Sequence, residues 1–303
     1  MVFTIGPELQ YIDPERLVEE FQNLGSGMTV THGFYELKCR TAVNDLDWNH
    51  MDPHHRPYIH RTYGNATRIA CGRNFQLSLT NYASSPLFVV VTDVRLTPGL
   101  FYQCFSVFNL LFVISVIRAV PDGDGSQLRI DWYIVSRPFW SFMHRFLDRK
   151  MKRLNIVQNA EDAPIRRRRR ELRETGFRFK SDEPDFLIAS SLDCHTIPPE
   201  LADVQHLRVE NTNSTNPNTF KIENLEFLYF YENGNLSLWP AVCPHEGGPL
   251  CDGRLEGGGL VCPWHGLKFA PLQLTRQARE GVISGVRFSL SEGNLTAVPL
   301  GDE

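Results

Sequence analysis

The spacing of apolar positions changes along the chain and predicts three kinds of element. Residues 14–24 follow a capping Asp13, begin with proline and repeat apolar residues at helical spacing, which predicts a short helix. From Leu77 to Val135, β-branched and aromatic runs alternate with turn residues, which favours an antiparallel meander. From about Phe139 to Arg173 the pattern is helical, with an interruption expected near Pro164.

Three apolar runs make up the expected meander: Pro86–Leu96, Leu100–Val120 and Leu128–Val135. The richest of them, Leu100–Val120, contains three polar residues and many Phe, Val and Ile side chains. This composition is typical of a buried strand and not of a membrane-spanning helix. We therefore expect no transmembrane segment.

A polar segment bounded by proline, Lys180–Pro184, is the expected domain boundary. Beyond it, short strand patterns alternate with turns and almost nothing has helical period, so the second domain is predicted to be all-β. A length of 303 residues suits two domains, which we place at 1–184 and 185–303. The predicted fold class is thus α+β followed by all-β.

Composition narrows the functional classes. A hydrophobic fraction of 42% and a charged fraction of 22% are typical of a globular protein, and the net charge of −4 predicts no binding of nucleic acid. The first residues lack the basic and apolar parts of an export signal, so a cytoplasmic protein is expected. The run Arg166–Arg170 is a local exception, read as a solvated helix face or, alternatively, as a docking site for an acidic ferredoxin.

The first chemical motif pairs Cys243-Pro244-His245 with Cys262-Pro263-Trp264-His265. Two Cys and His pairs on two turns can hold one metal centre, and these ligand types favour zinc or an iron-sulfur cluster. The glycines after each pair make the segment resemble the Rieske 2Fe-2S motif. The resemblance implies that Cys243 and Cys262 bind one iron and that His245 and His265 bind the other.

One alternative reading of this motif and one separate expectation for a nearby cysteine remain. A structural zinc knuckle would use the same residues. Cys251 has no evident partner and is expected to be a buried thiol.

The second chemical motif is a group of four histidines within eleven residues, and this density indicates a metal site. The candidate pair is His55 and His60. Residues five apart on a regular α-helix point about 140° apart and cannot share one ion. We expect Pro57 to block a regular helix there, so that His60 can turn back toward His55.

Asn49, Asp52, His55 and His60 stand in an arrangement that resembles the mononuclear-iron segment of the Rieske non-haem iron oxygenases. The resemblance implies that His55 and His60 are iron ligands and that Asn49 lies near the iron. It also implies that Asp52 connects an iron-bound histidine to a Rieske histidine. The remaining two, His50 and His54, match no ligand position.

A third ligand, a carboxylate, would complete an iron site that leaves one face open for dioxygen. Glu161-Asp162 resembles the family's Glu-Asp segment, which implies Asp162 as the ligand, with Glu161 as the alternative. Without the resemblance, the place of Asp162 just before Pro164 also suits a helix N-cap.

The family resemblance implies a START-like helix-grip catalytic domain followed by a Rieske domain, the reverse of the usual domain order. It also implies a Rieske 2Fe-2S cluster, a mononuclear Fe(II), electrons from NAD(P)H through a separate reductase or ferredoxin, and a homotrimer. The expected activity is hydroxylation or another oxidation of a hydrophobic small molecule with dioxygen. The alternatives are a START-like ligand-binding protein fused to a Rieske electron carrier without a second iron, and a metal-stabilised scaffold without redox activity.

Overall fold

The computed structural model of the chain describes residues 16, 19–20, 27–72, 74–83, 88–107, 110–183, 196–210 and 216–300. These residues form two compact units, and the first gives way to the second between Arg166 and Arg167. The helix expected at 14–24 lies mostly outside the described residues, although the three described positions in it are helical. The expected domain boundary after residue 184 also lies outside them and stays a prediction.

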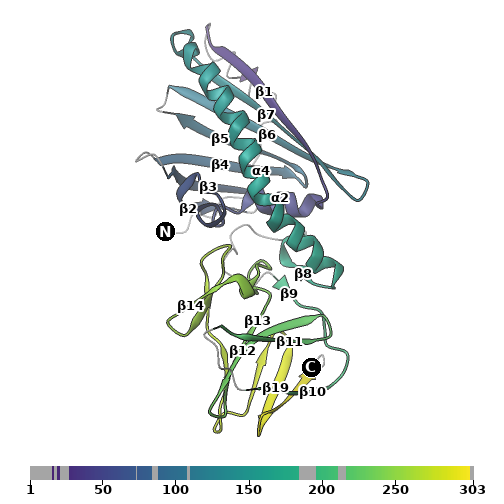
Figure 1. Cartoon of the computed structure of the whole chain (residues 1–303). Coiled ribbons are helices and arrows are strands. Elements are labelled where there is room, and N and C mark those ends of the chain that lie inside the picture. The colour runs from purple at the N-terminus through teal and green to yellow at the C-terminus, as the bar shows by residue number, and fades with distance from the viewer. Residues whose placement is uncertain are drawn as a thin grey trace. The chain divides into compact units, whose positions relative to one another are not determined.

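A seven-stranded antiparallel sheet forms the first unit, with its strands in the order β1-β7-β6-β5-β4-β3-β2. The long helix α4 crosses one face of this sheet (Figure 1). The strands are β1 (Thr29–Cys39), β2 (Tyr63–Cys71), β3 (Phe75–Tyr82), β4 (Phe88–Thr97), β5 (Leu100–Val107), β6 (Leu111–Asp122) and β7 (Gly125–Ser136). The helices are α2 (Val43–Met51), α3 (Arg56–Ile59), the 3-10 turn η1 (Pro138–Met143) and α4 (His144–Glu174).

The expected meander is present, but Leu100–Val120 is not a single strand. It folds back as the hairpin β5–β6, in which Val107 pairs with Leu111. A continuous strand of this length would reach about 70 Å, far beyond the neighbouring strands, whereas the hairpin buries both halves in one sheet. The sequence pattern also missed β1, which pairs with β7 along its whole length.

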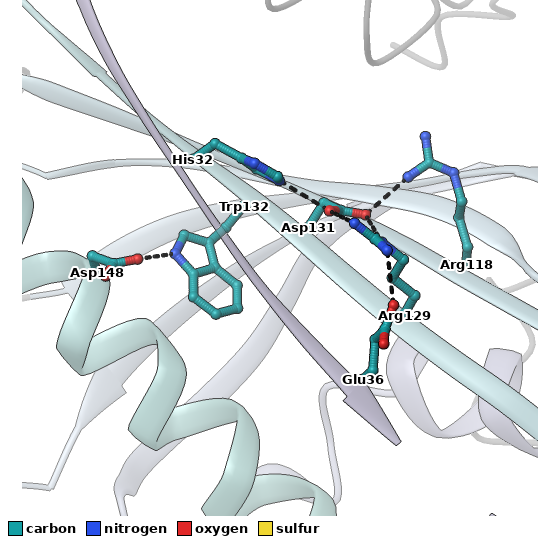
Figure 2. A network of polar contacts seen from close by, with 7 residues as sticks. All are labelled: His32, Glu36, Arg118, Arg129, Asp131, Trp132 and Asp148. Carbon is teal, nitrogen blue, oxygen red and sulfur yellow. Dashed lines mark hydrogen bonds and ion pairs between the residues drawn. The ribbon is translucent and has the colours of Figure 1, made fainter. Parts of the chain in front are cut away.

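Contacts between β7 and α4 fix the helix on the sheet. Trp132 donates an indole hydrogen bond to Asp148 of α4 at 2.9 Å (Figure 2). Gly33 on β1 leaves room for this pair, since a Cβ at this position would lie 2.3 Å from the Asp148 carboxylate. Leu147 of α4 packs into the same apolar core.

The neighbouring residue Asp131 organises a charged network with β1 and β6. It accepts hydrogen bonds from Arg129 at 2.9 Å and Arg118 at 3.2 Å, and its carboxylate lies 2.9 Å from His32 Nε2 (Figure 2). Burial alone would raise the pKa of Asp131, but the hydrogen bonds from Arg129 and His32 outweigh it and lower that pKa.

Helix α4 continues unbroken through Pro164, so the predicted interruption is wrong. A proline inside a helix loses one backbone hydrogen bond and costs about 3 kcal/mol. Burial of Ile165 and Leu172 on the following turns offsets this cost. Asp162 therefore lies in the middle of a helix, and its interpretation as an N-cap is also wrong.

Beyond the C-terminal end of α4, the described part of the second unit is built from strands and short turns, which confirms the all-β prediction for this part of the chain (Figure 1). Two four-stranded sheets, β10-β20-β19-β18 and β11-β12-β13-β17, enclose its apolar core. A three-stranded sheet, β14-β15-β16, carries the turns discussed below. The elements are β8 (Arg178–Phe179), η2 (Lys180–Asp182), β9 (Thr196–Ile197), β10 (Gln205–Arg208), β11 (Asn218–Ile222), β12 (Leu225–Glu232), β13 (Asn235–Pro240), η4 (Leu250–Asp252), β14 (Arg254–Glu256), β15 (Gly259–Val261), β16 (Lys268–Phe269), β17 (Leu272–Leu274), β18 (Glu280–Ile283), β19 (Val286–Ser291) and β20 (Asn294–Pro299).

None of the helices in the described ranges is both long enough and apolar enough to cross a membrane.

Candidate metal centres

His55, His60 and Asp162 converge in the first unit, where one possible ligand atom from each lies within 4.8 Å of the others. Asp162 Oδ1 is 3.5 Å from His55 Nε2 and 3.3 Å from His60 Nε2. Ligand atoms that each lie about 2.1 Å from a shared ion are separated by ~3.0–3.4 Å. All three side chains are buried, and the same carboxylate oxygen of Asp162 faces both Nε2 atoms. The donor set and its spacing therefore fit a metal ion.

A single helical turn brings the two histidines together. Helix α3 runs from Arg56 to Ile59, with His55 as its N-cap and His60 as its C-cap. Pro57 does not block this helix, contrary to our expectation, because proline is compatible with the first helical turn. The reversal comes from the backbone of His60, which is extended (φ −96°, ψ 113°) and takes its side chain out of the helical progression.

Each histidine also contacts a second carboxylate through its Nδ1 atom. His60 Nδ1 lies 3.0 Å from Glu161 Oε2, and His55 Nδ1 lies 3.4 Å from Asp52 Oδ2. Asp52 is itself fixed, because its Oδ1 accepts a hydrogen bond from the backbone N–H of His54 at 2.9 Å. Carboxylates in such positions orient an imidazole and keep its Nε2 available to a metal.

The pKa values follow from burial and from these carboxylates. Burial opposes protonation of His55, but the hydrogen bond to Asp162 outweighs it and raises the pKa of His55. Burial lowers the pKa of His60. Although burial would raise the pKa of Asp162, the hydrogen bond from His55 lowers it to about 2. Asp162 is therefore a carboxylate at neutral pH, as a metal ligand must be.

His55, His60 and Asp162 line a cavity of about 70 Å³ on the sheet side of α4. Asn49 lines this cavity together with His50 and Ser115. Among the described residues, neither amide atom of the buried Asn49 has a hydrogen-bond partner. Asn49 thus lines the same cavity as His55, His60 and Asp162, and it can contact whatever occupies that cavity.

The residues of the first motif meet at a second place, in the second unit. Cys243, Cys262, His245 and His265 are all buried, and the two imidazole rings are 4.6 Å apart and perpendicular. Burial raises the pKa of the Cys243 thiol, whereas a hydrogen bond from Cys243 lowers the pKa of Cys262 to about 5. The four residues therefore form one compact donor set of the type that holds an iron-sulfur cluster.

The two loops that carry these residues have the same backbone hydrogen bonds. In the first, Gly247 N–H donates to the Cys243 carbonyl at 2.9 Å. In the second, Gly266 N–H donates to the Cys262 carbonyl at 3.0 Å. Both glycines have positive φ, 84° and 66°, which favours glycine at each. The matched turns explain why each cysteine is followed by a glycine four residues later.

Gly248 is required by a close approach between the two loops. A Cβ at this position would lie 2.8 Å from Cys262 Sγ and 3.1 Å from the Trp264 ring. Only glycine lets the first loop come this near to the second cysteine. Cys251, in contrast, is exposed, so the expectation of a buried thiol is wrong. It lies on the turn η4, where its side chain does not enter the core.

The sequence pattern suggests that the whole run Arg166–Arg170 is a solvated helix face. The structure shows that only part of it is. Arg166 and Arg169 are among the most deeply buried side chains, while Arg167 is exposed. Arg166 donates to the Asn159 side chain and carbonyl at 3.2 and 2.9 Å. Consecutive helical residues point in different directions around the axis, so a run of five arginines places some of them inward.

Arg169 was not predicted as a site residue. It forms an ion pair at 2.7 Å with Glu246, which directly follows His245, and it donates to Ser181 at 2.7 Å. Its guanidinium also lies 3.7 Å from the centre of the Phe179 ring. A sequence reading could not single out Arg169 because five arginines stand in a row and no local pattern separates them.

Comparison with known families and proteins bears on the second unit most directly. Residues 202–279 match the family model described as the Rieske [2Fe-2S] domain. A segment of 42 residues is 45% identical to the oxygenase component of dicamba O-demethylase from Stenotrophomonas maltophilia. This match covers 14% of the chain and only 12% of that protein.

Two solved structures are similar to part of the chain. The Zhui aromatase/cyclase from a Streptomyces strain has a TM-score of 0.40 and 12% identity, over 46% of this chain and 96% of that one. Truncated norcoclaurine synthase from Thalictrum flavum has a TM-score of 0.34 and 12% identity, over 40% of this chain and 86% of that one. At these values, neither structure bears on the activity of the chain.

The chain therefore contains a Rieske 2Fe-2S domain in its C-terminal part, preceded by an α+β domain in which an antiparallel sheet holds one long helix. This confirms the expected fold class and its order along the chain. A Rieske domain implies a 2Fe-2S cluster and a role in one-electron transfer.

Proposed function

We propose that this chain is a Rieske-type oxygenase, in which a mononuclear Fe(II) in the first unit oxidises a small molecule with dioxygen. The observation that carries the proposal is the convergence of His55, His60 and Asp162 beside a cavity. Two histidines and one carboxylate are the donor set that holds non-haem iron with positions left open. An iron ion held there would supply the site where dioxygen is activated.

The residues around this donor set have separate tasks. His55 and His60 would bind the metal through Nε2, and Asp162 through its carboxylate. Asp52 and Glu161 would hold the two imidazoles in the required tautomer by accepting from Nδ1. Asn49 would contact a ligand in the cavity without binding the metal firmly.

In the second unit, Cys243, Cys262, His245 and His265 would ligate the 2Fe-2S cluster. Electrons would reach the cluster one at a time from NAD(P)H through a separate reductase or ferredoxin. The similarity of a short segment to the oxygenase component of dicamba O-demethylase supports this arrangement of partners. The role of Asp52 in connecting the two redox centres and the homotrimer stay predictions.

Metal content of the purified protein tests the proposal. Anaerobically purified chain should contain about three irons and two acid-labile sulfides, since the cluster accounts for two irons. Two irons and two sulfides would instead indicate a ligand-binding protein fused to a Rieske electron carrier. Zinc without sulfide would indicate a metal-stabilised scaffold. Such a protein would lack the visible absorption bands that bleach when a 2Fe-2S cluster is reduced.

A further inference from the structure

Apart from the candidate metal ligands, three polar side chains that line the cavity of the first unit have buried side-chain atoms without an internal partner. Within the described ranges, no hydrogen bond reaches Ser115 Oγ, His50 Nε2 or either amide atom of Asn49. These atoms are inaccessible from outside, and Ser115 and Asn49 are about 2% exposed. Leaving a buried polar group unsatisfied costs about 1–3 kcal/mol. A ligand in the cavity that supplied the missing partners would recover this free energy.

Ser115 stands in an otherwise apolar surface. It lies on β6 between Val113 and Ile117, and all three side chains point to the same face of the sheet. Both neighbours belong to the apolar core, while Ser115 lines the cavity. A serine at this position packs less apolar surface than a valine or isoleucine would. Its side chain instead lines the cavity.

Other polar groups around the cavity are already engaged. The amide of Gln103 donates to Asp93 at 2.7 Å, and that of Gln158 donates to the Tyr63 hydroxyl at 2.8 Å. The remaining wall includes the apolar side chains Phe105, Ile117, Ile130, Met151 and Leu154. Among the described residues outside the candidate metal site, the cavity-lining side chains with buried atoms that lack a hydrogen bond are Ser115, His50 and Asn49.

We propose that the cavity selects an amphipathic substrate, whose apolar body lies against the aliphatic and aromatic wall and whose hydroxyl or carbonyl oxygen binds Ser115 and Asn49. This inference rests on the proposed function, and it names the substrate class of the same site. It refines the expectation of a hydrophobic substrate by one polar group in a fixed place.

Matched pairs of small molecules that differ by one hydroxyl test the proposal. Binding of phenol and benzene, and of the smaller pair 2-propanol and propane, is measured by titration calorimetry with the metal-loaded full chain under anaerobic conditions. At least one hydroxylated probe should bind about tenfold more tightly than its partner, the factor expected for one net hydrogen bond to a buried group. Equal affinities within each pair, or no binding of any probe, would overturn the proposal.

Ser115→Ala should reduce this preference to near unity by weakening the hydroxylated probe alone. The matched control is Ser78→Ala, since Ser78 is also a buried serine of the sheet whose hydroxyl has no internal partner among the described residues, yet it does not line the cavity. The control should keep the wild-type preference. A loss of preference in both variants, or in neither, would contradict a role for Ser115.

Two further measurements keep the outcomes distinguishable. If Ser115→Ala fails to fold, Ser115→Cys retains most of the volume while weakening the hydrogen bond, and the same loss of preference is expected. Iron content is determined on each sample. Three irons without a hydroxyl preference would refute the substrate class and leave the oxygenase proposal standing, whereas two irons would refute the oxygenase proposal itself.

Discussion

Arg169 and Glu246, 77 residues apart in the chain, form a fully buried ion pair at 2.7 Å. Glu246 directly follows His245, one of the proposed cluster ligands, and Arg169 belongs to the C-terminal half of α4. The pair therefore ties the first cluster loop to the helix that enters the second unit. The guanidinium of Arg169 also stacks on Phe179 and donates a hydrogen bond to Ser181.

Replacing Arg169 by methionine should destabilise the second unit strongly, because the buried carboxylate of Glu246 would lose its ion pair with the guanidinium. The expected loss is about 3–5 kcal/mol in the free energy of unfolding, measured by urea denaturation with the visible cluster bands as the probe. Arg167→Ala is the control from the same run. Its side chain is exposed and its contact with Glu171 is 3.9 Å long, so the loss should stay below about 1 kcal/mol. Similar losses in the two variants would contradict the role of the buried pair.

Gly248→Ala should prevent assembly of the cluster, since the added methyl group would lie 2.8 Å from Cys262 Sγ. We expect the variant to lack the visible absorption and the labile sulfide of the wild type. Gly258→Ala is the control: the space around Gly258 is open, and its positive φ, which Gly248 does not share, adds only a backbone cost. It should cost about 1 kcal/mol of stability and leave the cluster intact. A normal cluster in Gly248→Ala would show that the loop can move away.

His55→Ala and Asp162→Ala should each remove one iron per chain and abolish substrate oxidation, while the cluster spectrum survives. The reason is that both residues belong to the donor set of the first unit alone. His54→Ala, from the adjacent position outside this set, should keep the iron. Loss of the cluster bands along with the iron would contradict the assignment of these residues to a separate centre.

Glu161→Ala should weaken binding of Fe(II) by about 10–100-fold, the usual effect of removing a carboxylate that orients a metal-bound histidine. Glu161→Gln retains an oxygen that can accept from His60 Nδ1 and should recover most of the affinity. Titration of the apo site with Fe(II), followed by the iron retained per chain, measures both. If Glu161 were itself the ligand, the iron would be lost in both variants.

Stability near neutral pH should respond to Asp47, whose carboxylate accepts the Gly99 N–H at 3.0 Å and so anchors α2 to the turn between β4 and β5. Burial raises the pKa of Asp47 from 3.8 to about 6. Because the folded chain holds this proton more tightly than the unfolded chain does, the contribution is present at low pH and is lost as pH rises through about 6.

The difference in the free energy of unfolding between the wild type and Asp47→Asn should therefore change by about 2 kcal/mol between about pH 4.5 and 7.5. The wild type becomes less stable relative to the variant as the pH rises. Urea denaturation of both proteins at several pH values measures this difference. Parallel curves would mean that Asp47 titrates alike in the folded and unfolded chains.

Much of the architecture was contained in local sequence patterns. The apolar runs predicted the meander, and the turn-rich second half predicted an all-β domain, because strand period and turn chemistry are properties of neighbouring residues. The spacing of Cys243, His245, Cys262 and His265 indicated a metal centre for the same reason. Local patterns failed where a long run had to fold back, as in the β5–β6 hairpin, and where packing outweighed a helix-breaking residue, as at Pro164.

The sequence by itself determined which residues could ligate metals and in what order the two kinds of domain occur. Only the tertiary structure decided that Asp162, about a hundred residues beyond His60, lies in mid-helix with its carboxylate next to both imidazoles. It also decided that Glu161 faces the other side of His60, that Arg169 is buried on Glu246, and that Ser115 reaches a cavity without a partner. Such contacts join distant segments, and their geometry depends on the packing of the whole sheet and helix, which no local pattern encodes.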